Sequence, residues 1–275
     1  MKFGVREICD VVLRAKGTVK VGEATFSNDE PVIYFDSAKT STVEGSATTV
    51  YATGGRGNNK LLAWEGEKSV TFTMEDALLS PLGFSILSGA GLVDAEKVSG
   101  GMKVHTTLTT VIDTTSDITV DLATLTGKTI AEEKAYAFVM KDGQIVERLE
   151  PATPSGGSVT FTRKRKAAGQ LTGPQTVMVD FYVKVATGAV EMTIEPDKFG
   201  GFYYLEASTL FRRQDNGQDM AAAFVIPKVK IQSNFTFSMA SSGDPSTFTF
   251  TMDAFPDYTK FDPTKQVLFA LQIIE

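Results

Sequence analysis

The segment Ser69–Ala77 alternates large apolar residues with threonine, and the segment Ser246–Ala254 near the C-terminus repeats the pattern. A third version, Asn234–Met239, lies just before the second. Alternation with a period of two is typical of a β-strand with one apolar and one polar face. The pattern therefore predicts three strands, each with one apolar face and one face of small, neutral, polar side chains.

The two faces of these predicted strands separate the side chains into two groups. The polar group consists of Thr71, Thr73, Thr236, Ser238, Thr247, Thr249 and Thr251. The apolar group, which we expect in the core, consists of Val70, Phe72, Met74, Phe248, Phe250 and Met252. Because the alternating pattern recurs at both ends of the chain, residues 69–77 and 234–254 are expected to belong to one sheet system.

Helical periodicity is strongest just after the first of these strands. Ser80 before Pro81 is typical of an N-cap followed by proline at the first helical position, and Gly89 is a natural C-terminal stop. The pattern predicts a helix over these residues. The acidic pair Glu75 and Asp76 is expected to complement the dipole of this helix.

Other segments predict loops and further strands. Residues 36–60 are rich in Ser, Thr and Gly, which predicts a long exposed loop that has a function or is ordered by a partner. Asp142-Gly143 between two apolar runs predicts a β-hairpin, and residues 177–185 predict a long strand. The turn cluster Ser241–Ser246 predicts a hairpin between two alternating strands.

The residue composition of the chain changes at about residue 104, where it becomes rich in threonine, and returns to the earlier pattern at about residue 191. The fold class predicted is therefore mainly β, with two packed antiparallel sheets that resemble a sandwich or barrel and a flanking helix. Residues 1–103 and 191–275 form the predicted core β domain. Residues 104–190 form a predicted inserted β subdomain.

Composition limits the function classes. The chain has 275 residues, 42% of them hydrophobic, which is enough to bury a core. Its formal net charge of −6 argues against a general nucleic-acid coat, but it is compatible with a protein that lets nucleic acid pass. Cys9 is the single cysteine, so no intramolecular disulfide is expected, and its apolar setting predicts a small core residue.

The N-terminal segment does not resemble a signal peptide, and no apolar run approaches the roughly 20 residues of a membrane span. We therefore expect a soluble protein without a membrane anchor, made in a reducing cytoplasm. With His105 and Cys9 each alone of their type, we predict no catalytic residue, no metal site and no cofactor.

Two polar clusters have open interpretations. The glycine-rich segment Gly54, Gly55, Arg56, Gly57 and Asn58 lacks the ending of a phosphate-binding loop, and we interpret it as a flexible or partner-ordered loop in which Arg56 is a candidate inter-subunit anchor. The basic cluster Arg163, Lys164, Arg165 and Lys166 is either a docking patch for an acidic partner or a solvated loop.

Three successive segments resemble the tail tube proteins of long-tailed bacteriophages: Val50–Asn58, Leu61–Gly66, and Ser69–Ala77 with its helix. Pro227–Ala254 resembles the final hairpin of the same proteins. The similarity covers about residues 1–100 and 190–275, and it is one of texture and segment order. The middle segment has no clear counterpart in the smaller members.

The resemblance implies subunits that form hexameric rings, stacked into a hollow tube through which DNA passes. Strands of neighbouring subunits would close one barrel around the lumen, and long loops would bridge the rings. The implied partners are other copies of the chain and the tail sheath, tape measure, baseplate and tail terminator proteins. The implied location is the virion tail, assembled in the host cytoplasm. We hypothesise that the Thr and Ser faces line the lumen.

Two other classes compete with this interpretation. One is another virion structural protein, such as a head-to-tail connector, a tail terminator or a fibre-type β protein. The other is a carbohydrate-binding β-sandwich module, which requires an exposed aromatic platform. Its one candidate platform in the sequence is Phe202-Tyr203-Tyr204.

Overall fold

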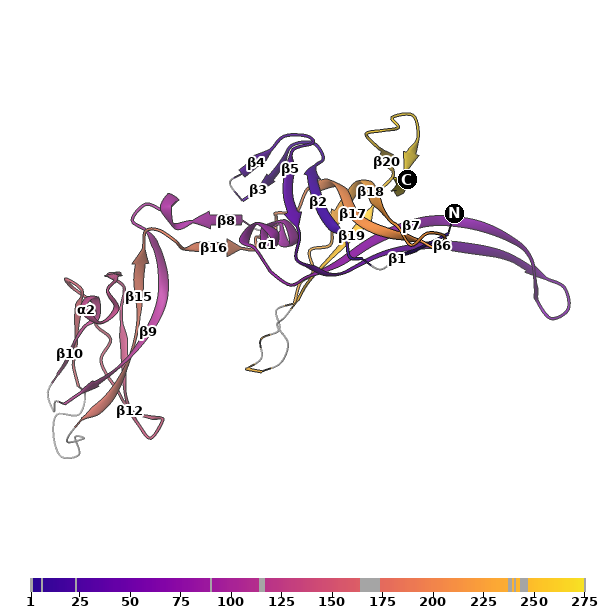
Figure 1. The fold of residues 1–275 in the computed structure, drawn as a ribbon. Helices are drawn as coiled ribbons and strands as arrows, with labels where there is room; N and C mark the ends of the chain where they lie inside the picture. The colour runs from indigo at the N-terminus through magenta and orange to yellow at the C-terminus, as the bar shows by residue number, and fades with distance from the viewer. Residues whose placement is uncertain are drawn as a thin grey trace. The chain divides into compact units, whose positions relative to one another are not determined.

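Strands dominate the structure, a computed structural model in which 60% of residues are in strands and 6% in helices (Figure 1). The fold is therefore mainly β, as the alternating patterns predict. The structure describes all residues except 1, 6, 23, 90, 114–116, 164–173, 237, 238, 240, 243–246 and 275. The chain divides into two compact units, unit 1 with residues 1–92 and 192–275, and unit 2 with residues 93–191.

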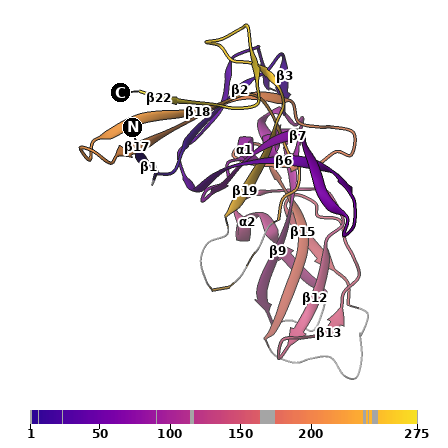
Figure 2. The same cartoon turned by 90° about the vertical axis from the view of Figure 1, so that its right-hand side faces the viewer.

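Unit 1 is built around a nine-stranded antiparallel sheet with the order β5-β2-β17-β18-β19-β7-β6, in which β1 also pairs with β17 and β22 with β18. Its sheet strands are β1 (Phe3–Val5), β2 (Asp10–Ala15), β5 (Pro31–Phe35), β6 (Ala38–Gly54), β7 (Asn59–Asp76), β17 (Phe202–Arg213), β18 (Asp219–Ile231), β19 (Phe248–Ala254) and β22 (Ala270–Ile273). Both termini lie beside the β17–β18 hairpin (Figure 2).

Smaller elements complete unit 1. They are β3 (Val19–Val21) paired with β4 (Ala24–Phe26), helix α1 (Pro81–Ser88), and β20 (Asp257–Tyr258) paired with β21 (Gln266–Val267). Strands β8 (Gly91–Asp94) and β16 (Val190–Thr193) pair with each other, and the unit boundaries fall within them.

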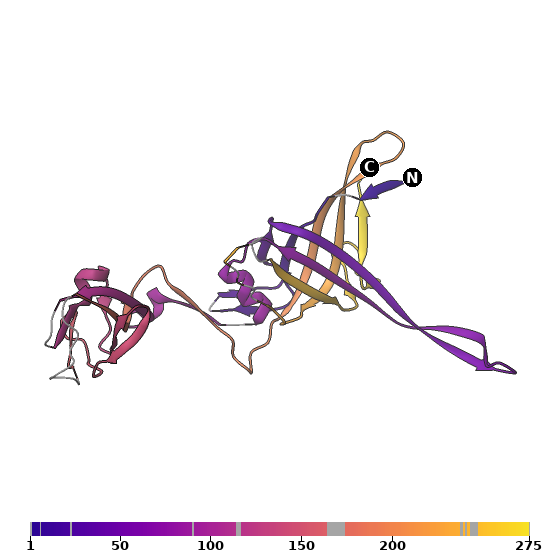
Figure 3. The same ribbon diagram turned by 90° about the horizontal axis from the view of Figure 1, so that it is seen from below.

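The large sheet curls until its two ends meet around one core (Figure 3). The ring of Phe35 on β5 lies 4.9 Å from that of Phe250 on β19, although three strands, β2, β17 and β18, lie between them in the sheet order. At the same seam, the backbone N–H of Cys9 donates to Ser41 Oγ at 3.2 Å. The two halves of the sheet thus pack against each other as the layers of a sandwich do.

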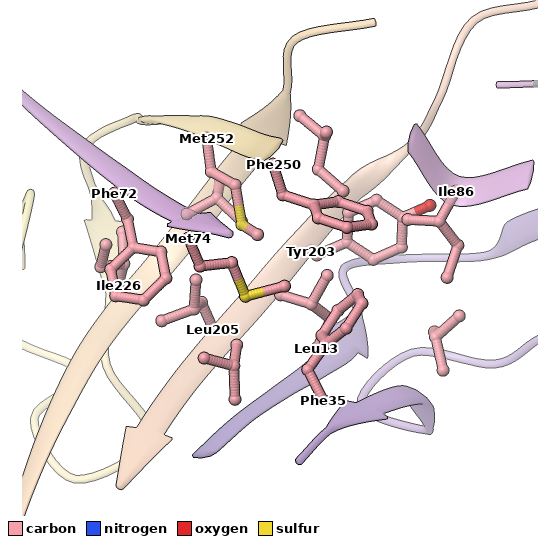
Figure 4. Close-up of a cluster of buried hydrophobic side chains, with 14 of the residues drawn as sticks. Leu13, Phe35, Phe72, Met74, Ile86, Tyr203, Leu205, Ile226, Phe250 and Met252 are labelled. Carbon is pink, nitrogen blue, oxygen red and sulfur yellow. The ribbon is translucent and has the colours of Figure 1, made fainter. Parts of the chain in front are cut away.

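The core between these halves is apolar (Figure 4). Its fully buried members include Leu13, Phe72, Met74, Leu205, Ile226, Phe250 and Met252. Ile86 and Leu87 from α1 close the core on one side. Cys9 is buried in the same cluster, which confirms its role as a small core residue, and burial raises the pKa of its thiol.

The first and last repeats of the alternating sequence are neighbours in this sheet. β19 pairs antiparallel with β7, so that Phe250 lies opposite Met74 and Thr251 opposite Thr73. Antiparallel partners place their side chains on the same face. The apolar residues of both repeats therefore share the core, and the threonines share the other face.

Helix α1 begins and ends as predicted. Ser80 Oγ accepts a hydrogen bond from the N–H of Gly83 at 2.9 Å, and Pro81 is the first helical residue. Gly89 has a φ of 67°, and a Cβ added there would lie 2.7 Å from the backbone nitrogen of Gly200. The left-handed conformation and the close approach both require glycine at this C-cap.

The acidic pair before the helix does not complement its dipole. Glu75 and Asp76 are the last residues of β7, and the first turn of α1 contains no acidic residue. Asp76 is buried, and it accepts hydrogen bonds from the hydroxyl of Ser37 and, at 3.3 Å, from the N–H of Leu78. Its carboxylate therefore stabilises the turn between strand and helix.

The predicted loop over residues 36–60 is wrong. β6 covers most of it as a strand that pairs with β7 from Ala38 to Gly54. Only residues 55–58 form a turn. The Thr-rich alternation of this segment is compatible with a strand because β-branched residues suit a pleated surface, and a long paired neighbour supplies the hydrogen bonds.

The predicted third strand is also wrong over its described residues. β18 ends at Ile231, and residues 232–236 and 239 are not in a strand. The N–H of Gln232 donates to the carbonyl of Thr251 at 2.8 Å, and beyond this residue the chain leaves β19. Phe235 then packs edge-on against Phe84 of α1, with 5.1 Å between ring centroids. This contact replaces strand pairing.

Unit 2 has its own apolar core beneath a five-stranded sheet. Its elements are the 3₁₀ turn η1 (Ala95–Lys97), β9 (Met102–Ile112), β10 (Ile118–Asp121), α2 (Leu122–Thr126), β11 (Thr129–Ile130), β12 (Tyr136–Lys141), β13 (Gln144–Arg148), β14 (Ser158–Phe161) and β15 (Gln175–Val185). β9, β11 and β12 pair with β15, and β12 with β13. The hairpin predicted at Asp142-Gly143 is confirmed as the β12–β13 turn.

The ionisation of Tyr203 makes the free energy of unfolding of unit 1 depend on pH in the alkaline range. Burial raises the pKa of its phenol from 10.0 to about 12. The neutral phenol therefore contributes stability that is complete below pH 10 and is lost as the pH rises towards 12, about 2–3 kcal/mol in total. Denaturant unfolding across this range should show the loss, and Tyr203→Phe should remove it. An equal loss in Tyr203→Phe would contradict the prediction.

Candidate functional site

The candidate site is a polar face of the sheet of unit 1, opposite the core. Four predicted lumen residues, Thr71, Thr73, Thr249 and Thr251, lie on it. Thr249 is exposed, and the other three are half-buried. β6 adds Thr40 and Thr42, opposite Glu75 and Thr73, to the same face. We call this surface the threonine face.

The other three predicted lumen residues lie outside this surface or cannot be placed. Thr236 is exposed in the non-strand segment after β18. Thr247 is half-buried and precedes β19. Ser238 lies outside the described residues.

The threonine face is acidic, and the expectation of a neutral face is wrong. Glu44 lies opposite Thr71, and Glu75 lies opposite Thr249. Asp253 also lies opposite Thr71, and it accepts a hydrogen bond from the threonine hydroxyl at 3.3 Å. Lys230 lies opposite Asp253, and Lys228 lies two residues away on the same side of β18, with both ammonium groups over the Phe202 ring. The three carboxylates outnumber these two ammonium groups.

The sheet of unit 1 ends at two unlike edges, β5 and β6. β5 has five residues and begins with Pro31, whereas β6 has seventeen. The outer side of an edge strand presents backbone groups that a further strand can pair with. A long edge such as β6 is therefore a template for strand addition, and short edges with proline resist it.

Before residue 71, β7 pairs only with β6, and the two strands continue as a two-stranded hairpin past the sheet (Figure 1). We call residues 45–70 the arm. Large apolar side chains on it are exposed, namely Val50, Tyr51, Leu61, Leu62 and Trp64. A two-stranded hairpin is marginally stable in water, so exposed apolar residues on one indicate a contact with another chain.

The glycine-rich cluster forms the tip of the arm. Gly54 ends β6, and Gly55, Arg56, Gly57 and Asn58 form the turn, in which the N–H of Asn58 donates to the carbonyl of Gly55 at 3.2 Å. Arg56 is exposed at this tip. The proposed role of Arg56 as an anchor stays a prediction. The alternation of apolar residues on both strands, Val50 with Ala52 and Leu62 with Trp64, was the signal that the segment is an arm and not a loop.

The structure describes one member of the basic cluster, Arg163. Arg163 is 1% exposed and donates from Nη2 to Glu147 Oε2 and to Gln175 Oε1, both at 2.8 Å. Its guanidinium is therefore part of the core of unit 2, and Arg163 does not belong to an exposed docking patch. Lys164, Arg165 and Lys166 lie outside the described residues.

The remaining candidates for chemistry are isolated. His105 lies on β9, as predicted, with Nε2 2.9 Å from Asp180 Oδ1 on β15. Among the described residues, no group of three or more His, Cys, Asp or Glu side chains could hold a metal ion. No helix in the described part of the chain is long and apolar enough to cross a membrane.

These features define a class: a mainly β protein with surfaces suited to contact with other chains. A comparison with protein families matches residues 16–266 to the YomU/Tube protein family, and the chain belongs to this family. It is thus a structural protein of the phage tail tube. The match runs through residues 104–190, the segment without a clear counterpart in the smaller tail tube proteins. A search of curated proteins gives no match.

Proposed function

We propose that the protein forms stacked hexameric rings around a lumen through which DNA passes during ejection. The observation that carries the proposal is the pairing of the two threonine repeats, Thr73 opposite Thr251, in one continuous sheet face backed by the core. A tube wall needs this combination of a rigid apolar layer and a smooth polar surface. The ring number comes from the resemblance to tail tube proteins.

The charge of the threonine face suits DNA as a passing cargo. Stable binding of DNA requires cations that replace the counterions of its phosphates. Glu44, Glu75 and Asp253 outnumber Lys228 and Lys230, so we infer that phosphates are repelled and not held. We therefore propose that Thr71, Thr73, Thr249 and Thr251 face the lumen, where their hydroxyls hydrate the surface without trapping the cargo.

The sheet edges and the arm support self-assembly. A ring that pairs the edges of neighbouring subunits closes a barrel and removes every free edge. The long edge of β6 is suited to such a contact. The arm, with Gly54–Asn58 at its tip, would reach a neighbouring subunit. Other proposed partners are the tail sheath, tape measure, baseplate and tail terminator proteins, in a virion tail assembled in the host cytoplasm.

Negative-stain microscopy of the purified protein tests this proposal. A tail tube subunit should give rings or long hollow tubes of even bore. Single rings that do not stack would favour a connector or terminator, and solid fibres a fibre-type protein. A monomer at all concentrations would contradict the proposal. The carbohydrate-binding alternative has lost its candidate platform, because Tyr203 and Tyr204 are buried.

Removing unit 2 should leave assembly intact. Ala95 donates a backbone hydrogen bond to the carbonyl of Ala189 at 2.9 Å, so a two-residue turn can replace residues 96–188. None of the core residues or sheet strands of unit 1 lies in that range. We expect tubes of unchanged bore by electron microscopy. A variant that keeps its β circular dichroism but forms no tubes would show that unit 2 belongs to the wall.

A further inference from the structure

A pocket of about 470 Å³ lies between the segment before β2 and strand β6. Its apolar lining comes from Val5, Cys9, Val43, Phe72, Phe224 and Phe269, and its polar lining from Glu7, Ser41 and Thr42. We call it the Phe72 pocket. It adjoins a second pocket of about 440 Å³, because Val5 and Glu7 line both. An apolar floor with a polar rim is typical of a site for an apolar side chain.

The size of the Phe72 pocket fits an aromatic ring. An apolar cavity of about 150 Å³ is enough to bind benzene. The Phe72 pocket has about three times that volume. It can therefore receive an indole together with a neighbouring aliphatic side chain.

The arm offers such side chains on one of its faces. Val50 pairs with Trp64, and Ala52 with Leu62, so all four side chains lie on the same side of the hairpin. Trp64 is 53% exposed and Leu62 is 60% exposed. Tyr51 and Ala63 lie on the other side, where Lys60 stacks over the Tyr51 ring at 3.7 Å. The arm thus carries an apolar stripe centred on Trp64.

The stripe cannot reach the pocket of its own chain. Val50 lies seven residues beyond Val43 on β6, and Trp64 lies eight residues before Phe72 on β7. At about 3.3 Å per residue, a paired strand holds these positions about 23–27 Å apart. Both strands are paired throughout this stretch, so the arm cannot fold back. The occupant must come from another molecule.

We propose that the Phe72 pocket receives the Trp64 stripe from the arm of a second copy of the chain. This inference rests on the proposed self-assembly and specifies its contact. Arm and pocket are different surfaces, so the contact is heterologous and each copy keeps one free arm and one free pocket. Such contacts build rings or open-ended stacks, and they do not stop at a dimer.

Charges at the two surfaces match this arrangement. The tip of the arm carries the cation Arg56, and the pocket carries the acidic side chain of Glu7. Arg56 and Glu7 are both exposed. Opposite charges at the rim of an apolar contact orient the partners, and like-charged surfaces would repel each other.

Disulfide trapping tests the contact, because the single native cysteine is easily removed. In a Cys9→Ser background, Ser41→Cys, which lines the pocket from the core side of β6, is combined with Leu62→Cys on the stripe. The matched control combines Ser41→Cys with Ala63→Cys, which is the adjacent residue on the opposite side of the arm. Mild oxidation should give covalent dimers and longer ladders with Leu62→Cys only. Equal cross-linking of both pairs, or none in protein that forms tubes, would overturn the inference and leave the tube function standing.

A second variant measures the contribution of the indole. Trp64→Ala should weaken self-association by about 30-fold or more, the effect of losing an interface hot spot. Tyr51→Ala on the opposite side should weaken it much less. Neither change should alter the unfolding of the isolated subunit, because both side chains are exposed. Sedimentation of dilute protein gives the constants, and unchanged association in Trp64→Ala would overturn the inference. Protein that never associates would overturn both this contact and the proposed function.

Discussion

Phe250→Ala is expected to lower the free energy of unfolding of unit 1 by about 3–5 kcal/mol. The Phe250 side chain is fully buried, and its ring packs on Phe35 across the seam where the curled sheet closes. Truncation removes this contact and leaves a cavity between the two halves of the sheet. Denaturant unfolding followed by circular dichroism should show the loss, and hydrogen exchange should locate it in β7 and β19.

Thr249→Ala on the same strand is the matched control. Thr249 is exposed on the threonine face and contributes nothing to the core, so its replacement should change stability by less than about 0.5 kcal/mol. A Phe250→Ala protein with the stability of the Thr249→Ala protein would show that the closed seam does not hold the sheet together.

Arg163→Ala should destabilise unit 2 to a similar degree, by about 3–5 kcal/mol. The change leaves the Glu147 carboxylate, whose side chain is 11% exposed, without the guanidinium 2.8 Å away. A buried charge that has lost its partner is far more costly than a lost surface pair. Calorimetry should show a lower melting temperature for unit 2 and an unchanged transition for unit 1.

Two further variants separate pair and charge. Arg163→Met combined with Glu147→Leu removes both charges, and it should recover most of the stability because no ion remains buried. Arg212→Ala breaks an exposed pair with Asp219 and should cost much less, since water screens that pair. Equal losses in Arg163→Ala and Arg212→Ala would contradict the prediction.

Local sequence patterns predicted helix ends and turns correctly where one or two residues determine the backbone conformation. Ser80 and Pro81 predicted the start of α1, and Gly89 its end. Asp142-Gly143 predicted the β12–β13 turn, because a tight hairpin requires positive φ at both positions, here 50° and 75°. Alternation also predicted correctly that Phe72, Met74, Phe250 and Met252 enter the core, whereas Val70, expected there too, is half-buried outside the core cluster.

Long-range contacts explain the failures. Residues 36–60 were predicted as a loop because Ser, Thr and Gly are typical of loops, and only the pairing with β7 makes β6 a strand. The segment around Phe235 alternates as a strand does, yet its ring packs on α1 instead. Arg163 belongs to a run of basic residues that suggests a surface, but Glu147 and Gln175 draw its side chain into the core.

The sequence alone predicted part of the candidate site. The threonines of the two paired repeats are identifiable from alternation alone. The acidity of the threonine face depends on neighbouring strands, because Glu44 comes from β6 and Lys230 from β18. The residues that line the Phe72 pocket are spread along the sequence from Val5 to Phe269, so no local sequence pattern predicts the pocket.

The central claim is that the threonine face lines the bore of a tube, and cryo-electron microscopy of assembled protein tests it most directly. A reconstruction should show a hollow tube whose inner wall is a continuous β-barrel. The account predicts Thr73 and Thr251 on the inner surface, with Phe72 and Phe250 within the wall. A tube with these threonines on its outer surface would contradict the account, as would an assembly without a continuous bore.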